Sequence, residues 1–261
     1  MSNPSAAQPL SSADAVLVQG ASRGIGLALA RRLVERGEAG TVFATCRDPA
    51  AAPELASLAG AHPQRLHAVA LDLLDEASIA AAAAAVGARA ARLALLVNCA
   101  GVLHEPGGMQ PERRLADVDA EAFLRSMRVN ALGPLLMAKH FEPLLRSAQR
   151  AVFASISARV GSIGDNRLGG WYAYRASKAA QNMVTRNLSI ELRRRTRGII
   201  CVALHPGTVD TALSEPFQTR VPPDRLFTPD YAAEKLLAVI ESLDADSNGR
   251  FFAWDGSEIP W

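Results

Sequence analysis

Short apolar runs alternate with longer helical stretches along almost the whole chain, and this alternation limits the possible folds more than any other feature. The runs expected as strands are Ala15–Gln19, Thr41–Thr45, Leu66–Leu71, Leu93–Asn98, Ala151–Ile156, Ile199–Leu204 and Arg250–Ala253. Most are apolar throughout, as parallel strands covered on both faces are. Stretches such as Ile25–Glu35 and the alanine-rich Ile79–Ala91 indicate helices between them. The order predicts an α/β fold with one doubly wound parallel sheet of about seven strands and helices on both faces.

The length and the breaks in the pattern suggest the domain organisation. A chain of 261 residues with 49% apolar residues has enough material for one α/β domain. We expect this single domain to span residues 14–261, after a flexible polar leader at 1–13 that lacks the basic start and apolar stretch of a secretory signal. The irregular segments at the rim of the sheet are expected to surround a substrate pocket, the last of them as a mobile cover; they are Glu105–Pro111, Ser162–Gly170 and Glu215–Pro229.

Charge and cysteine usage indicate which partners to expect. The formal net charge is only +2, so neither nucleic acid nor a membrane surface is an expected partner. No apolar run approaches the roughly 18 residues of a membrane helix. The three cysteines have no metal-ligand spacing, so no metal site is expected, and reduced structural thiols would suit a cytoplasmic protein.

A glycine-rich turn joins the first expected strand to the first expected helix. Gly20, Gly24 and Gly26 follow Gln19. At such a junction glycine allows a sharp turn, lets a pyrophosphate approach the backbone and leaves helix N–H groups free to bind it. A tight strand–helix turn without a ligand is the alternative. The position in an α/β chain favours a dinucleotide site of the Rossmann type.

The residues after the second expected strand indicate which dinucleotide would bind. An NAD site usually has an acidic side chain there for the ribose 2′-hydroxyl. This chain has Cys46-Arg47-Asp48, and Arg23 lies inside the glycine turn. Two guanidinium groups would suit a 2′-phosphate, which favours NADP(H) over NAD(H). The alternative is that Arg47 only pairs with Asp48.

Tyr174 and Lys178 form a candidate catalytic pair. Their spacing of four residues places both side chains on one face of a helix. A phenol has an ordinary pKa of about 10, and a neighbouring ammonium lowers the pKa toward neutrality, which would suit proton exchange with a substrate oxygen. The spacing alone is common, and an ordinary pair on a helix surface would show it too.

Together with these features, several short motifs occur in the order found in the short-chain dehydrogenase/reductase family, which the chain resembles over almost its whole length. The pieces are Gly20-x-x-x-Gly24-Ile25-Gly26, Leu71-Asp72-Leu73, Asn98-Cys99-Ala100-Gly101, Val129-Asn130, the region of Ser157, Tyr174-x-x-x-Lys178 and Pro206-Gly207. Within the family, the stretches 169–178 and 204–207 are most similar to the group of the bacterial C-factor and the sniffer-like carbonyl reductases.

The resemblance implies a role for each matching residue. Tyr174 would exchange the proton, Lys178 would bind the nicotinamide ribose and tune the phenol, and Asn130 would support a proton relay. Ser157 would hold the substrate oxygen. The implied cofactor-binding residues are Gly20, Ser22, Arg23, Gly24, Ile25, Gly26, Arg47, Asp72, Leu73, Asn98, Ala100, Gly101, Tyr174, Lys178, Pro206, Gly207 and Thr208.

The serine is where the chain departs most from the family pattern. The usual place, three residues before Gly161, holds Ala158, and Ser157 lies one residue earlier. A bulge would be needed to turn Ser157 toward the site; Ser162, or Tyr174 acting without a serine, is the alternative. Gln19 replaces the usual threonine and is expected to bond backbone instead. Structural roles are expected for Tyr172 and His205, and Trp254 is left open between a pocket and an interface.

The expected function is therefore an NADP(H)-dependent oxidoreductase of carbonyl reductase type, which interconverts a small carbonyl compound and its alcohol. The alternative is a C-factor-like signalling or regulatory protein that binds the dinucleotide with weak or no turnover. The sequence does not identify the substrate or the physiological direction, and a homodimer, a homotetramer and a monomer all stay open.

Overall fold

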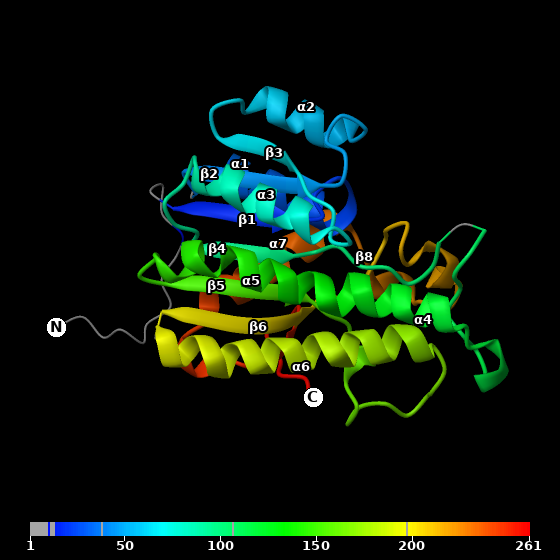
Figure 1. Cartoon of the computed structure of the whole chain (residues 1–261). Helices are drawn as coiled ribbons and strands as arrows, with labels where there is room; N and C mark the ends of the chain where they lie inside the picture. The colour runs from blue at the N-terminus through cyan, green and yellow to red at the C-terminus, as the bar shows by residue number, and fades with distance from the viewer. Residues whose placement is uncertain (1–9, 11–13, 38, 106, 197) are drawn as a thin grey trace.

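The computed structural model describes residues 10, 14–37, 39–105, 107–196 and 198–261. A parallel sheet of seven strands forms its centre, in the order β3-β2-β1-β4-β5-β6-β9. The strands are β1 (Ala15–Gln19), β2 (Thr41–Cys46), β3 (Leu66–Ala70), β4 (Leu95–Asn98), β5 (Ala151–Ile156), β6 (Ile199–His205) and β9 (Phe251–Ala253). All seven predicted strands are present, and the predicted doubly wound Rossmann fold is confirmed (Figure 1).

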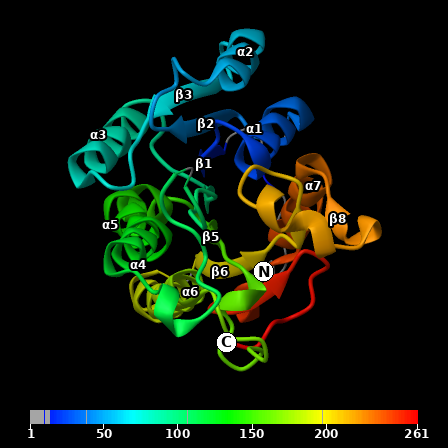
Figure 2. The same ribbon diagram turned by 90° about the vertical axis from the view of Figure 1, so that its right-hand side faces the viewer.

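Helices cover both faces of the sheet (Figure 2). One face carries α1 (Gly24–Arg36), α2 (Pro53–Ala61) and α7 (Pro229–Ser242), and the other α3 (Glu76–Gly87), α5 (Gly133–Arg146) and α6 (Tyr172–Arg195). The short α4 (Ala120–Met127) leads into α5 through a π-helical turn, η2 (Arg128–Leu132). The sequence indicates neither this turn nor α2.

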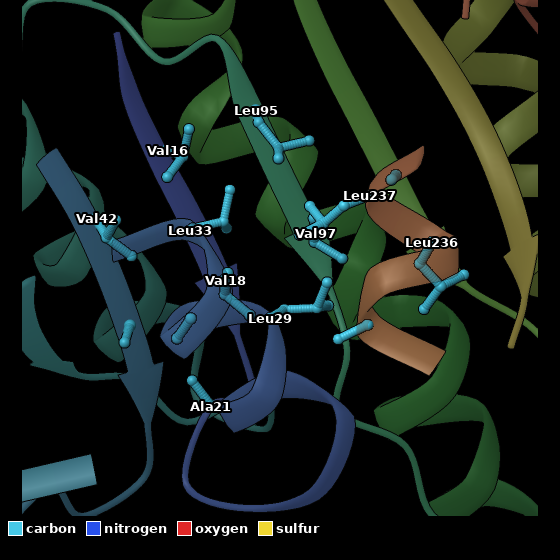
Figure 3. Close-up of a cluster of buried hydrophobic side chains, with 14 of the residues drawn as sticks. Val16, Val18, Ala21, Leu29, Leu33, Val42, Leu95, Val97, Leu236 and Leu237 are labelled. Carbon is cyan, nitrogen blue, oxygen red and sulfur yellow. The ribbon is translucent and has the colours of Figure 1, made fainter. Parts of the chain in front are cut away.

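Each face of the sheet has its own hydrophobic core. Side chains alternate along β1, so Val16 and Val18 pack toward α1 and α7 (Figure 3). Leu17, between them, packs on the other face toward α5. Leu29 and Leu236 complete the first layer from the helices, and both are fully buried. This double burial explains why the strands are apolar throughout.

The predicted helix boundaries differ from the structure where a cap outweighs helix propensity. The alanine-rich helix expected at 79–91 spans Glu76–Gly87 instead. It begins earlier because the Asp75 carboxylate accepts the Ala77 N–H at 2.9 Å, a favourable N-cap. It ends earlier although alanines continue, because the chain turns there toward β4.

The segment expected as an irregular cover, 215–229, contains short regular pieces. It consists of two 3₁₀ turns, η4 (Glu215–Arg220) and η5 (Pro223–Arg225), followed by β8 (Leu226–Phe227) and the start of α7. β8 pairs in parallel with β7 (Thr208–Val209), directly after β6. The segment is thereby tied to the carboxyl end of the central sheet.

The predicted leader, residues 1–13, lies outside the described residues except for Leu10, which is partly buried against the α1 layer. Among the described helices, none is long and apolar enough to cross a membrane. The cytoplasmic location stays a prediction.

Candidate active site

The candidate site lies at the carboxyl edge of the sheet, which faces the viewer in Figure 2. The strand order reverses between β1 and β4, because β1 leads outward to β2 and β3 while β4 leads the other way. In open α/β sheets, ligands bind in the crevice outside the carboxyl ends of the strands at this reversal, which here is at the ends of β1 and β4. The glycine turn follows β1, and Asn98 ends β4 beside it.

The glycine turn lies so close to its neighbours that side chains would collide. Gly20 has φ +83° and Gly24 φ +58°, conformations that favour glycine. A Cβ on Gly20 would lie 2.6 Å from the Ala100 nitrogen, and one on Gly26 2.2 Å from the Gly20 oxygen. The turn therefore needs glycine at these positions for the fold itself.

The same turn leaves polar groups free for an anion. Arg23 is the N-cap of α1 and forms no capping hydrogen bond, and the first turn of α1 holds no acidic side chain. The first N–H groups of α1 thus remain as donors beside the positive end of the helix dipole. Gln19 bonds backbone, as predicted: its Oε1 accepts the Ala100 N–H at 3.2 Å.

Two buried polar atoms near the ends of β2 and β4, the strands on either side of β1, lack hydrogen-bond partners. They are Thr45 Oγ1 on β2 and Asn98 Oδ1 on β4. An unsatisfied buried acceptor is costly, so such atoms often mark a binding site. Together with the open glycine turn, they fit the edge of a bound dinucleotide.

The two arginines predicted to favour NADP(H) are both exposed beside this crevice. Asp48 does not form an ion pair with Arg47 in the structure, because its Oδ1 accepts the N–H groups of Ala50 and Ala51 at 2.9 and 3.3 Å. The alternative interpretation of Arg47 as the ion-pair partner of Asp48 therefore lacks support. Arg23 is equally exposed at the start of α1.

The predicted adenine-side residues lie next to the crevice after β3. The Asp72 carboxylate accepts the Leu74 N–H at 2.9 Å, and its own N–H donates to Ser78. Leu73 is 6% exposed and packs beneath Gly133, where a Cβ would lie 3.1 Å from it. Asp72 thus shapes the turn into α3, and Leu73 anchors α5.

Tyr174 and Lys178 lie on one buried face of α6, with the Lys178 Nζ 5.8 Å from the centre of the phenol ring. Burial raises the pKa of Tyr174 above its ordinary value, which keeps the phenol protonated. Burial also lowers the pKa of Lys178 to about 8. The sequence-based expectation that Lys178 lowers the phenol pKa is opposed here by burial, so the site favours the proton-donating form.

Lys178 is held by hydrogen bonds at the end of β5. Its Nζ donates to the Ile156 carbonyl at 2.8 Å and to Gln181 Oε1 at 2.9 Å. A Cβ on Gly101 would lie 3.6 Å from this Nζ and 3.3 Å from Asn130 Oδ1. Gly101, Asn130 and Lys178 therefore converge, and a side chain at position 101 would crowd the two polar groups.

Asn130 lies in the π-helical turn η2 and is fully buried. Its side chain accepts the Val102 N–H, donates to the Val102 carbonyl, both at 2.8 Å, and donates to Ser177 Oγ at 2.9 Å. π-helical turns often occur at functional sites because they redirect a side chain. Here the turn directs the Asn130 side chain toward the loop after β4 and toward α6.

The Ser157 side chain is buried and already hydrogen-bonded within the protein. Its hydroxyl donates to Asn182 Oδ1 at 2.7 Å, and it is 3% exposed. Asn182 follows Tyr174 by eight residues of helix, which is about 12 Å along the axis. A hydroxyl has a single proton to donate, so this bond opposes the predicted contact with a substrate oxygen. The alternative Ser162 accepts the Asp165 N–H at 3.1 Å instead.

The turn Pro206-Gly207-Thr208 joins β6 to β7 at the same edge. Gly207 has φ +79°, and a Cβ there would lie 2.6 Å from the Phe227 ring. Trp254 packs edge-on against that ring at 4.7 Å, so it supports the turn. His205 has an unpaired buried Nδ1, and burial lowers its pKa to about 4.

Trp171 and Glu112, which together shape the start of α6, were not singled out from the sequence. Trp171 is the N-cap and has the left-handed φ +51°. The carboxylate of Glu112, 4% exposed, accepts the Ala173 N–H at 3.2 Å. Glu112 lies 61 residues away, so no local pattern reveals this cap. Gly169-Gly170 before Trp171 is the only available signal of an unusual turn.

The family model for the short chain dehydrogenases matches residues 14–221, and the chain belongs to this family. The C-signal of Myxococcus xanthus is 40% identical over 147 residues, which cover 56% of this chain and 83% of that protein. The NADPH-bound carbonyl reductase from chicken fatty liver has a TM-score of 0.86, 35% identity and coverage of 98% and 96%. Carbonyl reductase Sniffer of D. melanogaster has a TM-score of 0.84, 29% identity and coverage of 95% and 99%. The predicted resemblance is confirmed, and the chain is an oxidoreductase of this family that uses a nicotinamide dinucleotide.

Proposed function

We propose that this protein is an NADP(H)-dependent carbonyl reductase in which Tyr174 is the acid–base group. The observation that carries the proposal is the buried Tyr174–Lys178 pair, at the same carboxyl edge of the sheet as the glycine turn and the uncapped start of α1. The NADPH-bound carbonyl reductase with the same fold supports the cofactor.

The residues that would hold the dinucleotide fit it by their open donors and their shape. Gly20, Ser22, Gly24, Ile25 and Gly26 would cradle the pyrophosphate at the start of α1, where the donors are uncapped.

The rest of the crevice would bind the two ends of the dinucleotide. Arg23 and Arg47 would bind a 2′-phosphate. The edges of the crevice would be formed by Asp72, Leu73, Asn98, Ala100, Gly101, Pro206, Gly207 and Thr208. When bound, the reduced cofactor supplies the hydride that reaches the carbonyl carbon.

The protein's own groups would handle the proton. In the reduction direction, the protonated Tyr174 donates to the carbonyl oxygen as negative charge develops there. The positive charge of Lys178 stabilises the phenolate that forms when this proton leaves. Asn130 fixes the neighbouring backbone, from which the relay to solvent would start. Ser157 as the oxygen-binding group stays a prediction.

The decisive experiment follows oxidation of NADPH by the purified protein, with NADH in parallel, against a panel of small aldehydes, ketones and quinones. We expect turnover with at least one carbonyl class and a preference for NADPH. Tight NADPH binding without turnover of any member would instead support the second candidate function.

That second candidate is a dinucleotide-binding signalling or regulatory protein with weak or no turnover. Two observations favour it: Ala158 stands at the usual serine position, and Ser157 is bonded to Asn182. The similarity to a protein named C-signal points the same way. A homodimer or homotetramer remains a prediction for either function, to be measured by light scattering.

A further inference from the structure

Four aromatic rings form a continuous row that begins at the candidate catalytic phenol. Trp171 contacts Tyr174 edge-on, with ring centres 6.2 Å apart. Trp171 also contacts Phe217 at 5.0 Å, and Phe217 contacts His104 at 5.8 Å, again edge-on. The rings come from the start of α6, from η4 and from the loop after β4, so the row spans three separate segments.

The indole has its place in this row because Trp171 adopts an unfavourable backbone conformation. Trp171 is the only residue other than glycine with positive φ in the described part of the chain. For a bulky residue this conformation is strained, and such strain persists only where the surroundings impose it.

Two neighbouring residues impose the conformation. The Glu112 carbonyl accepts the Trp171 N–H at 2.6 Å, while the Glu112 carboxylate caps Ala173. The Arg175 Nε donates to the carbonyls of Gly169 and Gly170 at 3.1 and 3.0 Å. The turn before α6 is thereby fastened from both sides, and the indole is directed toward Tyr174 and Phe217.

The row is placed to contact a substrate. Trp171, Phe217 and His104 are all only partly buried, so ring surface remains exposed next to the phenol. The segment before Trp171 also exposes Ile163 and Leu168, with 79% and 91% of their surfaces accessible. Partly exposed aromatic rings beside the phenol favour contact with a flat apolar group over a flexible polar one.

We infer that Trp171, supported by Phe217, is a specificity-determining residue that selects carbonyl compounds with an aryl group next to the reacting carbon. The part of this inference that concerns the reaction rests on the proposed function, whereas the aryl-selective binding does not depend on it. Glu112 and Arg175 act as positioning residues, since they hold the backbone that directs the indole.

A matched ligand pair tests the inference without turnover. Benzamide and cyclohexanecarboxamide both present a carbonyl that hydride transfer does not reduce, and they differ in whether the ring is flat and aromatic. Their affinities are measured by NMR titration in the presence of NADP⁺. We expect benzamide to bind about five- to tenfold more tightly, the size of one or two aromatic contacts. Equal affinities would overturn the inference.

Variants assign the preference to the rings. Trp171→Leu and, independently, Phe217→Leu should each reduce the aryl preference to within about twofold, whereas Trp171→Phe should retain most of it. Tyr172→Leu is the matched control, an exposed aromatic one residue away, and should keep the full preference. A folded Trp171→Leu protein that retains the preference would contradict the assignment; Phe217→Leu gives the same test if that variant does not fold.

The kinetic counterpart separates the two proposals. The kcat/KM ratio of benzaldehyde to cyclohexanecarbaldehyde should fall in the same variants. Aryl-selective binding without reduction of either aldehyde would refute the proposed function and leave the aromatic selection intact. Reduction of both aldehydes with no aryl preference would support the proposed function and refute the aromatic selection.

Discussion

The two halves of the crevice are built by different means. On the β1–β4 side, the site is formed by backbone groups. Gly20, Gly24 and Gly26 allow the turn, and the first N–H groups of α1 have no capping partner. On the α6 side, large side chains from distant segments form the site, among them Trp171 and Phe217. The first half repeats a general solution for phosphate binding. The second is formed by side chains, which can differ in size and shape from one protein to another, so it is where substrate choice would be encoded.

The largest expected effect concerns the phenol where the halves meet. Tyr174→Phe removes the proton donor and should lower kcat by about 10²–10⁴-fold. NADPH affinity, measured by fluorescence titration, should change little, because the backbone-built half stays intact. Tyr172→Phe is the control and should keep its rate. Unchanged turnover in Tyr174→Phe would refute the mechanism.

The next largest effect is expected for a substitution in the glycine turn, on the β1–β4 side of the crevice. Gly26→Ala places a Cβ 2.2 Å from the Gly20 oxygen, so the turn must shift. We expect a stability loss of about 1–3 kcal/mol and strongly weakened NADPH binding. Gly60→Ala, in α2 with no atom near the new methyl group, should leave NADPH binding unchanged and should not lower the melting temperature, since alanine favours the helix. Equal behaviour of the two variants would mean that the turn tolerates side chains.

Cofactor choice is the third test. Arg47→Ala should reduce the preference for NADPH over NADH by about 10- to 100-fold, the range of a lost charge-assisted hydrogen bond. Kd values for both dinucleotides check this. Arg89→Ala, exposed on another part of the surface, serves as the control. An Arg47→Ala protein with an unaltered ratio would contradict the NADP(H) assignment.

A smaller effect is expected for the role of Ser157, on the α6 side of the crevice. If Ser157 serves the fold, Ser157→Ala should leave kcat within about threefold but cost about 1–3 kcal/mol of stability, because Asn182 loses its donor. Ala158→Ser should then raise kcat by about tenfold or more by adding a donor. A Ser157→Ala variant of normal stability whose kcat falls about 100-fold would restore the predicted catalytic role.

The smallest effect concerns pH. Burial lowers the pKa of Lys178 from 10.5 to about 8, so between these values the unfolded chain binds more protons than the folded one. The folded state therefore gains stability from this group as pH rises through that window, by at most about 1.4 kcal/mol per pH unit. Denaturant unfolding of wild type against Lys178→Met isolates this contribution. A difference between them that does not change from pH 8 to 10.5 would contradict the burial of the charge.

The sequence determined much of this fold. Periodic apolar runs located all seven strands, because a strand buried on both faces has almost no freedom of composition. The glycine turn could also be predicted from the sequence, because the backbone requires glycine there. The order of the family motifs then assigned Tyr174, Lys178 and Asn130 to one site, and the fold brings them together around α6.

Tertiary structure decided what depends on distant contacts. Only the packing of β5 against α6 shows that the Ser157 hydroxyl meets Asn182. Likewise, the Glu112 cap and the left-handed Trp171 arise from a contact across about sixty residues of chain, which no local pattern records. Local sequence specifies backbone needs and burial, whereas the direction of a side chain is set by whichever partner the fold brings near it.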